Sequence, residues 1–262
     1  MGSATRSALE AARTALSGAK NVDHAAGEQL LAAARTIADS PQLLAALMST
    51  SSGEKGTVAL VSTVFSSLSP ASRSLLEGIA TSRWSSSDDL LAGIEEIGIR
   101  AIAATAPRDG SLERELFEFG RVATSEPDLE LALSSKRGGA EGKRSLVDSL
   151  LGSASAQARA IASHLVQQPR GRRLAALVSQ AVSIVADVSG KGVATVSVAR
   201  PLTSAQRSSV EAAITARYGR EHVVNQVVDP ALIGGVRIQV GDEVIDGSIA
   251  ARLADLSLQL AS

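Results

Sequence analysis

The chain has 262 residues, of which 45% are hydrophobic and 2% aromatic, and its formal net charge is −1. This apolar content is enough for a folded core, and the length predicts two domains with room for a small third. Basic and acidic residues are balanced throughout, at 8 and 10 in residues 1–105, 11 and 10 in 106–189, and 7 and 7 in 190–262. Nucleic acid is therefore excluded as the main partner, because it requires clustered Lys and Arg with stacking aromatics.

The absence of particular residues and segments excludes further classes. The chain has no cysteine, which excludes disulfides, thiolate metal sites and a cysteine nucleophile. No uncharged apolar run reaches the roughly 20 residues that a membrane-spanning helix needs. The stretch after Met1 is small and polar, without the apolar core of a signal peptide. We therefore expect a soluble protein of a reducing compartment that reaches a membrane only through a partner.

The chain from Ala4 to about Val188 is predicted to be helical, because apolar residues recur every three or four positions. Ala and Leu dominate these stretches, and both lose little side-chain entropy in a helix, which favours closely packed helices. Helix starts are predicted where proline stands at the first helical position, in two cases after a capping serine. These starts are Ser40-Pro41, Ser69-Pro70 and Pro127.

The helical region is duplicated. Residues 34–47 align with residues 120–133 at an offset of 86, with arginine, proline and two leucines at equivalent positions. Similarity at one fixed offset predicts two copies of one helical module, a first bundle over 1–105 and a second over 106–189. The segment from Asp88 to about Thr105 is a candidate for the last helix of the first copy and the first helix of the second.

After Ser189 the pattern changes to that of strands. Residues 192–199 and 222–228 alternate apolar and small or polar residues, and a helix from Thr203 to Arg217 is predicted between them. A strand, a helix and a strand in this order predict a parallel pair joined by a crossover.

The carboxy-terminal segment adds a hairpin and a helix. Residues 235–240 and 243–246 flank Gly241-Asp242, which predicts a two-residue hairpin turn. Ser248 is placed to cap a final amphipathic helix. The predicted fold is therefore mostly α, with two tandem helical bundles followed by a small α/β domain with a mixed sheet over 190–262.

No residues are spaced as a catalytic site requires. General acid–base and nucleophilic sites need convergent side chains, whereas His24, His164 and His222 fall in three segments without metal-ligand spacing. The glycine-rich stretch 137–144 has arginine at both positions where a phosphate loop needs its first glycine and its Ser or Thr. We expect no active site, no cofactor and no metal.

Two features have both a structural and a functional interpretation. The apolar residues of the first helix are explained by core packing or by a groove for a partner helix. The glycine-rich stretch 228–256 is explained by tight turns around a hairpin and a helix start. For this second stretch the sequence itself also matches a family.

Residues 228–260, VDPALIGGVRIQVGDEVIDGSIAARLADLSLQL, resemble the carboxy-terminal signature of ATP synthase delta subunits, the family of the mitochondrial oligomycin-sensitivity-conferring protein. Residues 193–206 and 169–185 resemble the family's preceding strand and the last helix of its bundle. The additional helical copy, with SRW at 82–84 and PRGR at 169–172, is similar to the long delta subunits of actinobacteria. The matching signature positions are Asp229, Pro230, Gly234, Gly235, Gly241, Asp246, Gly247, Ser248 and Leu253.

The resemblance implies a non-catalytic stator subunit of the F-type ATP synthase, peripheral at the cytoplasmic face of the plasma membrane. Its helical part would grip amino-terminal helices of alpha subunits on the alpha/beta head. Its α/β domain would hold the b subunits of the peripheral stalk. The alternative is a stand-alone helical-repeat adaptor unrelated to ATP synthase, which is expected to lack the carboxy-terminal signature.

Both contacts are expected to seat apolar residues of one helix in a groove. The residues expected at the alpha-subunit contact are Ala8, Leu9, Ala12, Leu16, Leu75 and Ile79, as an exposed apolar strip between two helices. The residues expected at the b-subunit contact are Ile249, Leu253, Leu256 and Leu260, on one stripe of the last helix.

Overall fold

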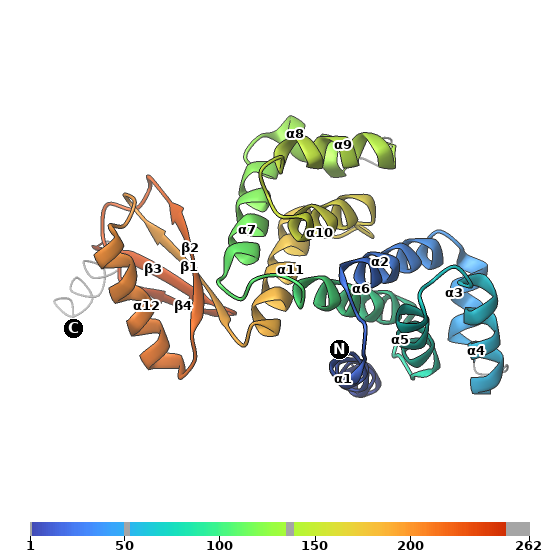
Figure 1. The fold of residues 1–262 in the computed structure, drawn as a ribbon. Helices are drawn as coiled ribbons and strands as arrows, with labels where there is room; N and C mark the ends of the chain where they lie inside the picture. The colour runs from blue at the N-terminus through green and yellow to red at the C-terminus, as the bar shows by residue number, and fades with distance from the viewer. Residues whose placement is uncertain (1, 50–52, 135–138, 250–262) are drawn as a thin grey trace, which may run out of the picture.

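The computed structural model describes residues 2–49, 53–134 and 139–249, which are mostly helical with one small sheet near the carboxy terminus (Figure 1). None of the helices in these ranges is both long and apolar enough to span a bilayer. The first six helices are α1 (Ser3–Gly18), α2 (His24–Ala38), α3 (Pro41–Met48), α4 (Gly53–Val64), α5 (Pro70–Thr81) and α6 (Ser87–Ala103). The next five are α7 (Ser111–Ala123), α8 (Pro127–Ser134), α9 (Ala140–Leu150), α10 (Ala156–Gln167) and α11 (Leu174–Val188).

The predicted serine caps and proline starts are confirmed. The Ser40 hydroxyl oxygen accepts a hydrogen bond from the Leu43 amide at 3.3 Å, and proline occupies the first turn of α3. Ser69 accepts from the Ser72 amide at 3.2 Å in the same way at the start of α5. Each cap satisfies an amide that the first helical turn leaves without a partner, which fixes where the helix begins.

Helices α1 to α6 share a first apolar core. Leu30 and Ile37 of α2, Leu76 of α5 and Ile94 of α6 are completely buried in it. Trp84, in the loop between α5 and α6, closes one side of this core, and its indole N–H donates to the Ile79 carbonyl at 2.8 Å. Burial of these large apolar side chains is the main stabilising contribution of the module.

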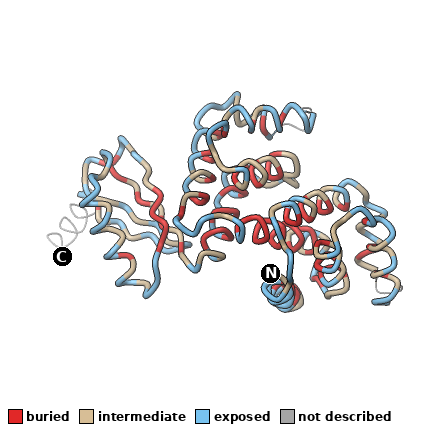
Figure 2. Tube along the Cα trace, viewed as in Figure 1, coloured by how far each residue is buried: buried red, intermediate tan, exposed pale blue. Residues whose placement is uncertain are grey.

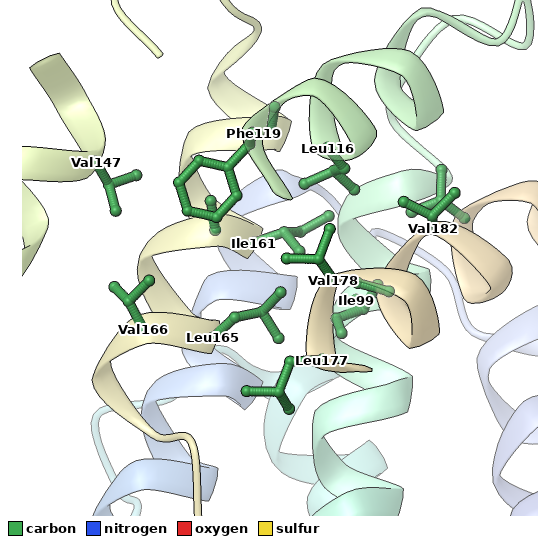
Figure 3. Packing of buried hydrophobic residues seen from close by; sticks show 14 of the residues in the cluster. Ile99, Leu116, Phe119, Val147, Ile161, Leu165, Val166, Leu177, Val178 and Val182 are labelled. Carbon is green, nitrogen blue, oxygen red and sulfur yellow. The ribbon is translucent and has the colours of Figure 1, made fainter. Parts of the chain in front are cut away.

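Helices α7 to α11 share a second apolar core (Figure 3). Leu116 and Phe119 of α7 meet Ile161 and Leu165 of α10, and Val182 of α11 packs beside them. The second core also receives side chains from the first six helices. They are Leu31 of α2 and Ile99, Ile102 and Ala103 of α6.

Helix α6 belongs to both cores. Its first turns place Leu90 and Ile94 in the first core, and its last turns place Ile99 and Ile102 in the second. Every residue from Gly93 to Ala103 is buried, and Figure 2 shows α6 as a buried tube through the middle of the helical region. One continuous helix therefore connects the two apolar cores without a flexible linker.

Helix α2 approaches α6 closely because glycines face each other at the crossing. A Cβ atom on Gly27 would lie 2.9 Å from the carbonyl oxygen of Gly98, and a Cβ atom on Gly98 would lie 2.7 Å from the Leu31 side chain. These separations are too short for any residue but glycine. The close approach lets Leu31 reach past α6 into the second core.

The α/β domain contains strands β1 (Gly192–Val198), β2 (His222–Val228), β3 (Val236–Val240) and β4 (Glu243–Asp246), with α12 (Ser204–Tyr218) between β1 and β2. The strand order is β2-β1-β3-β4. Strands β1 and β2 are parallel, and the other neighbouring pairs are antiparallel, so the predicted crossover, hairpin and mixed sheet are confirmed.

The two faces of the sheet have different neighbours. Ala194, Val196 and Val198 of β1 pack with Val224 of β2 against Ile214 of α12, which forms a third small core. The alternate residues of β1 point to the other face, where the sheet meets α7 and α11 (Figure 1). The α/β domain is thus attached to the second helical module through this second face.

Candidate docking surfaces and the buried charge cluster

The residues expected at the alpha-subunit contact are brought together, but they lie inside the first core. Ala8, Leu9 and Ala12 of α1 are 4–5% exposed, and Leu75 and Ile79 of α5 are 5% and 1% exposed. Leu16 is half-buried against the same core. The prediction that these side chains form an exposed strip is therefore wrong. Helical amphipathicity alone does not distinguish a core-facing stripe from a partner-facing one.

Small residues, rather than large apolar ones, are exposed next to this part of the core. On α1, Ala11 and Ala15 are exposed one turn apart, on the flank away from Arg13, which pairs with Glu96 of α6 at 2.6 Å. On α5, Gly78 is exposed, and a Cβ atom there would have open space around it. The surface beside α1 and α5 is therefore open to close approach by another helix.

The carboxy-terminal signature forms a tight structural junction. Gly235 has φ of +83°, and a Cβ atom there would collide with the carbonyl oxygen of Gly247. The Gly247 amide donates to the Val236 carbonyl at 2.9 Å, and the Ile249 amide donates to the Gly234 carbonyl at 3.1 Å. The chain that leaves β4 therefore passes directly over the start of β3, which only glycine permits.

Polar side chains of the signature support the same junction. The Asp246 carboxylate accepts from the Ser248 amide at 2.9 Å and pairs with Arg237 at 2.9 Å. The hydrogen bonds from Ser248, followed by the Arg237 guanidinium, lower the pKa of Asp246 to about 2. Asp229 accepts from the Ala231 amide at 2.9 Å, and Pro230 lies in the same turn. Gly241 lies in the turn between β3 and β4, at the other end of β3. These contacts shape the backbone, as the structural interpretation of the motif predicts.

Exposed apolar side chains flank the junction. Ile233 is 80% exposed, and Val228 and Ile249 are each 46% exposed. Of the residues expected at the b-subunit contact, Ile249 is therefore an exposed neighbour of the signature, whereas Leu253, Leu256 and Leu260 lie outside the described residues. Ile249 lies beside Gly234, the neighbour of Ile233, and adjacent exposed apolar side chains of this kind are typical of a partner-binding surface.

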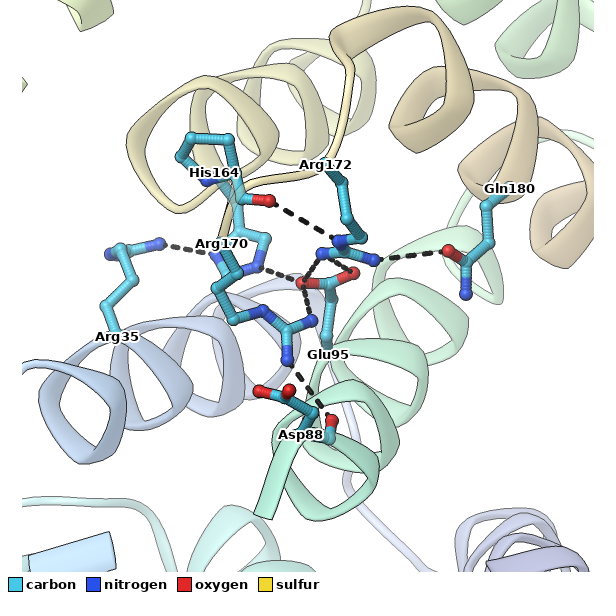
Figure 4. Close-up of polar contacts among 8 residues, drawn as sticks. Arg35, Asp88, Glu95, His164, Arg170, Arg172 and Gln180 are labelled. Atoms are coloured by element: carbon cyan, nitrogen blue, oxygen red, sulfur yellow. Dashed lines mark hydrogen bonds and ion pairs between the residues drawn. The ribbon is translucent and has the colours of Figure 1, made fainter. Parts of the chain in front are cut away.

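A buried charge cluster lies where α6, α2, α10 and the loop before α11 meet (Figure 4). Glu95 of α6 is 4% exposed, and its carboxylate pairs with Arg170 and Arg172 of that loop, each at 2.9 Å. The same carboxylate lies 3.3 Å from Nε2 of His164 on α10. On the other side of the ring, Arg35 of α2 lies 3.0 Å from His164 Nδ1. The cluster thus joins both helical modules.

The contacts of His164 define its protonation state. Arginine only donates, so Nδ1 accepts from Arg35 and Nε2–H donates to Glu95, which is the neutral ring. Burial, together with the charges of Arg35 and Arg170, lowers the pKa of His164 and outweighs the opposing effect of Glu95. Burial alone would raise the pKa of Glu95, but the hydrogen bond from His164 and the charges of Arg170 and Arg172 bring it to about 2.

A second set of ion pairs lies on the next residues of α6. Arg100 of α6 pairs with Glu96, one turn earlier, at 2.8 Å and with Asp187 of α11 at 2.7 Å. Glu96 also accepts from Arg13 of α1. This chain of charges runs from α1 through α6 to α11, and it links the first and second modules by a path separate from Glu95.

Sequence reasoning missed these polar residues of α6. The sequence feature that could have revealed them is the position of Glu95, Glu96 and Arg100 inside the otherwise apolar run 90–103. Charges within such a run indicate buried partners, because an unpaired buried charge is costly. No set of His, Asp and Glu side chains within the described ranges is arranged to hold a metal ion.

Comparison with known proteins places the chain in a family. The family model "ATP synthase delta (OSCP) subunit" matches residues 100–260. An ATP synthase subunit delta from Leifsonia xyli subsp. xyli is 47% identical over 263 residues, covering all of both chains. A second, from Streptomyces griseus subsp. griseus, is 36% identical over 270 residues and also covers both chains completely.

Among solved structures, a chain of the Toxoplasma gondii mitochondrial ATP synthase hexamer aligns with 64% of this chain and 96% of its own length. Its identity is 18% and its TM-score is 0.36. The full-length actinobacterial relatives cover the additional helical copy as well as the signature. The adaptor alternative finds no support, and the chain belongs to the family of ATP synthase delta (OSCP) subunits.

Proposed function

We propose that this chain is the non-catalytic peripheral-stalk subunit that links the alpha/beta head of the F-type ATP synthase to the b subunits. In this role it keeps the head from turning with the rotor, so that proton-driven rotation is coupled to ATP synthesis. The observation that carries the proposal, beside family membership, is the helix α6 shared by two apolar cores. A stator has to transmit torque, and a continuous buried helix resists bending better than a linker does.

The overall arrangement supports this role. Helices α1 to α5 lie at one end of the molecule and the α/β domain at the other, with α6 and the second module between them (Figure 1). The ion pairs of Glu95 and Arg100 tie α6 to the second module, and Arg13 of α1 pairs with Glu96 of α6. Such a body is suited to hold one partner at each end. Two contacts on one rigid protein also raise the effective affinity of each.

The proposed head contact is the surface between α1 and α5. Ala11, Ala15 and Gly78 give this surface small exposed residues. The expected contact residues Ala8, Leu9, Ala12, Leu75 and Ile79 lie beneath it as part of the first core. An amino-terminal helix of an alpha subunit would lie over them, since small residues let two helices approach closely. Leu16, which is half-buried at the end of α1, would extend the apolar contact.

The proposed stalk contact is the end of the α/β domain that carries the family signature. Val228, Ile233 and Ile249 supply exposed apolar surface there. Residues Leu253, Leu256 and Leu260 continue the apolar stripe in the sequence, and we propose that they contact the b subunits. The protein would then reach the cytoplasmic face of the plasma membrane only through the assembled complex, and it would need no active site of its own.

The proposed division into units follows the sequence repeat, with a first bundle over 1–105, a second over 106–189 and the α/β domain over 190–262. The two cores support this division, with the qualification that α6 packs in both. We therefore propose that the two bundles move together as one body and that the α/β domain is a second body.

The proposal is tested by affinity purification of the tagged full-length chain from detergent-solubilised membranes of its own organism. The alpha, beta and b subunits should be recovered together with the chain in constant ratio. Chains carrying Ala216→Lys on the exposed face of α12 serve as a matched control for tagging and surface charge. Recovery of the chain free of all three subunits from membranes that contain intact ATP synthase would refute the proposal.

A further inference from the structure

A cavity of about 240 Å³ lies between the second helical module and the sheet of the α/β domain. It is distinct from the surfaces proposed for the head and the stalk. Its walls are mainly apolar and come from α7, α11, β1 and β2. The lining residues that matter here are Phe117, Val178, Val182, Val193, Thr195 and Asn225.

Asn225 of β2 is the unusual residue of this cavity. It is 3% exposed, and neither its amide nitrogen nor its amide oxygen has a hydrogen-bond partner among the described residues. Its neighbour across the parallel pair, Thr195 of β1, lines the same cavity. Buried polar groups in proteins are nearly always satisfied, so an amide with both groups unpaired indicates a partner that binds beside it.

The chemistry of the walls defines that partner. A primary amide offers one acceptor and one donor side by side, and its complement is another amide. The carboxylates of Glu and Asp are absent from the lining, and the one lining guanidinium, Arg121, is engaged by Glu118 at 2.7 Å. Phe117 and Val178 present apolar surface to the remaining volume. A neutral group with an apolar body therefore fits better than an ion.

We propose that this cavity binds a small neutral carboxamide attached to a ring, of about the size of benzamide. The amide atoms of Asn225 have almost no accessible surface in this structure, so the side chain would turn toward the cavity to exchange two hydrogen bonds with the carboxamide. The ring would lie between Phe117 and the valines of α11 and β1. The volume is below the roughly 300 Å³ at which drug-sized sites begin, so only a compact ligand fits. Because the walls come from both the second helical module and the α/β domain, a bound ligand would hold these two parts together.

The chain offers a direct probe of this site, because it has only two asparagines, Asn21 and Asn225. Full-length protein labelled with ¹⁵N-asparagine gives two pairs of side-chain amide signals, one pair for each asparagine. On titration with benzamide, the Asn225 side-chain signal should shift and saturate in the millimolar range expected of so small a ligand. The Asn21 signal should not move. Benzoate, which lacks the N–H donor and carries a charge, should cause no saturable shift.

A variant supports the same experiment through stability. Asn225→Leu keeps the approximate shape but removes both polar atoms. Its Tm should equal or exceed that of the wild type, because it removes an unpaired buried amide. Benzamide should raise the Tm of the wild type and not that of the variant.

Three results would overturn the proposal. The first is an Asn225 signal that stays unchanged up to the solubility limit of benzamide, which means that the cavity holds only water. The second is equal binding of benzoate, which assigns the site to an anion beside Arg121. The third is an undiminished Tm increase in Asn225→Leu. The benzamide titration of the labelled wild-type protein tests the proposal even if the Asn225→Leu variant fails to fold.

Discussion

His164 of α10 donates a hydrogen bond to Glu95 of α6 across 3.3 Å, in a position where both side chains are almost inaccessible to water. This bond requires an ionised carboxylate, and the acceptor nitrogen on the opposite side of the ring requires the imidazole to be neutral. Arg35 of α2 completes the arrangement by donating to the opposite ring nitrogen. The two helical modules are therefore held together by groups whose charge depends on pH.

Acid should destabilise the folded chain through this cluster. The lowered pKa of His164 keeps its ring neutral when folded, while the unfolded chain gains a proton as the pH falls below about 6.5. Glu95, with a pKa of about 2, stays ionised when folded, while its unfolded carboxylate gains a proton at about pH 4.3. In both cases the unfolded state binds more protons at low pH, so stability rises with pH.

We therefore expect the Tm, measured by calorimetry, to fall as the pH is lowered from about 8 to about 5. In this pH range His164 should be the main cause, because the carboxylate of Glu95 in the unfolded chain gains its proton only at lower pH. His164→Gln should be less stable at neutral pH but should flatten this dependence. Ala176→Gln adds the same amide side chain at an exposed position of α11 and removes no titratable group, so it is the control and should keep the wild-type slope. An unchanged slope in His164→Gln would contradict the assignment.

The crossing of α2 and α6 gives a prediction about glycine. Gly98→Ala places a methyl group against Leu31, and we expect it to lower the free energy of unfolding by about 1–3 kcal/mol, as overpacking does. Gly78→Ala, on the exposed side of α5 with open space around it, should instead be neutral or stabilise by about 0.5–1 kcal/mol through helix propensity. Urea denaturation of both variants measures the difference, and equal effects would argue against the close crossing.

The shared helix predicts which fragments fold. A fragment of residues 106–189 lacks α6, and its core loses Ile99, Ile102 and Ala103. A fragment of residues 87–189 retains them. Circular dichroism should show a cooperative, helix-rich unfolding transition for the longer fragment and a broad or absent transition for the shorter one. Equally cooperative transitions in both would mean that α6 is dispensable for the second core.

Variants on α1 separate docking from core packing. Ala11→Asp adds a charge to the exposed surface beside α5, so binding of an alpha-subunit amino-terminal peptide should weaken at least tenfold, equivalent to about 1.4 kcal/mol. Its Tm should stay close to that of the wild type. Leu9→Asp should lower the Tm steeply, because it buries a charge in the first core.

Fluorescence anisotropy with a labelled peptide, together with thermal melts, measures both properties. Ala132→Asp, at an exposed alanine of α8 in the second module, is the control for added surface charge and should bind normally. If Ala11→Asp binds as tightly as this control, the head contact lies on another surface.

Much of the fold follows from local sequence signals. The helical period, the Ser-Pro starts at α3 and α5 and the turn at Gly241 each reflect a preference of a few neighbouring residues. Those preferences act over one or two turns of chain, so they are visible in the sequence. The repeat at an offset of 86 adds the information that one arrangement of helices occurs twice.

The site was less predictable because its contacts join distant segments. Glu95 lies 75 and 77 positions from Arg170 and Arg172, and no periodicity reports such a pairing. Leu9 shows the opposite difficulty, since an apolar helix face has the same pattern whether it meets its own core or a partner. Asn225 sits in a valine-rich strand, and only its burial without a partner distinguishes it.

The most direct test of the central claim is ATP-driven proton pumping in inverted membrane vesicles from the organism of this chain. Vesicles stripped of this subunit should hydrolyse ATP without acidifying their interior, because the head is no longer held against the rotor. Adding back the full-length protein should restore acidification at an unchanged hydrolysis rate per head. Equal acidification with and without the protein would contradict the claim that this chain couples the head to the stalk.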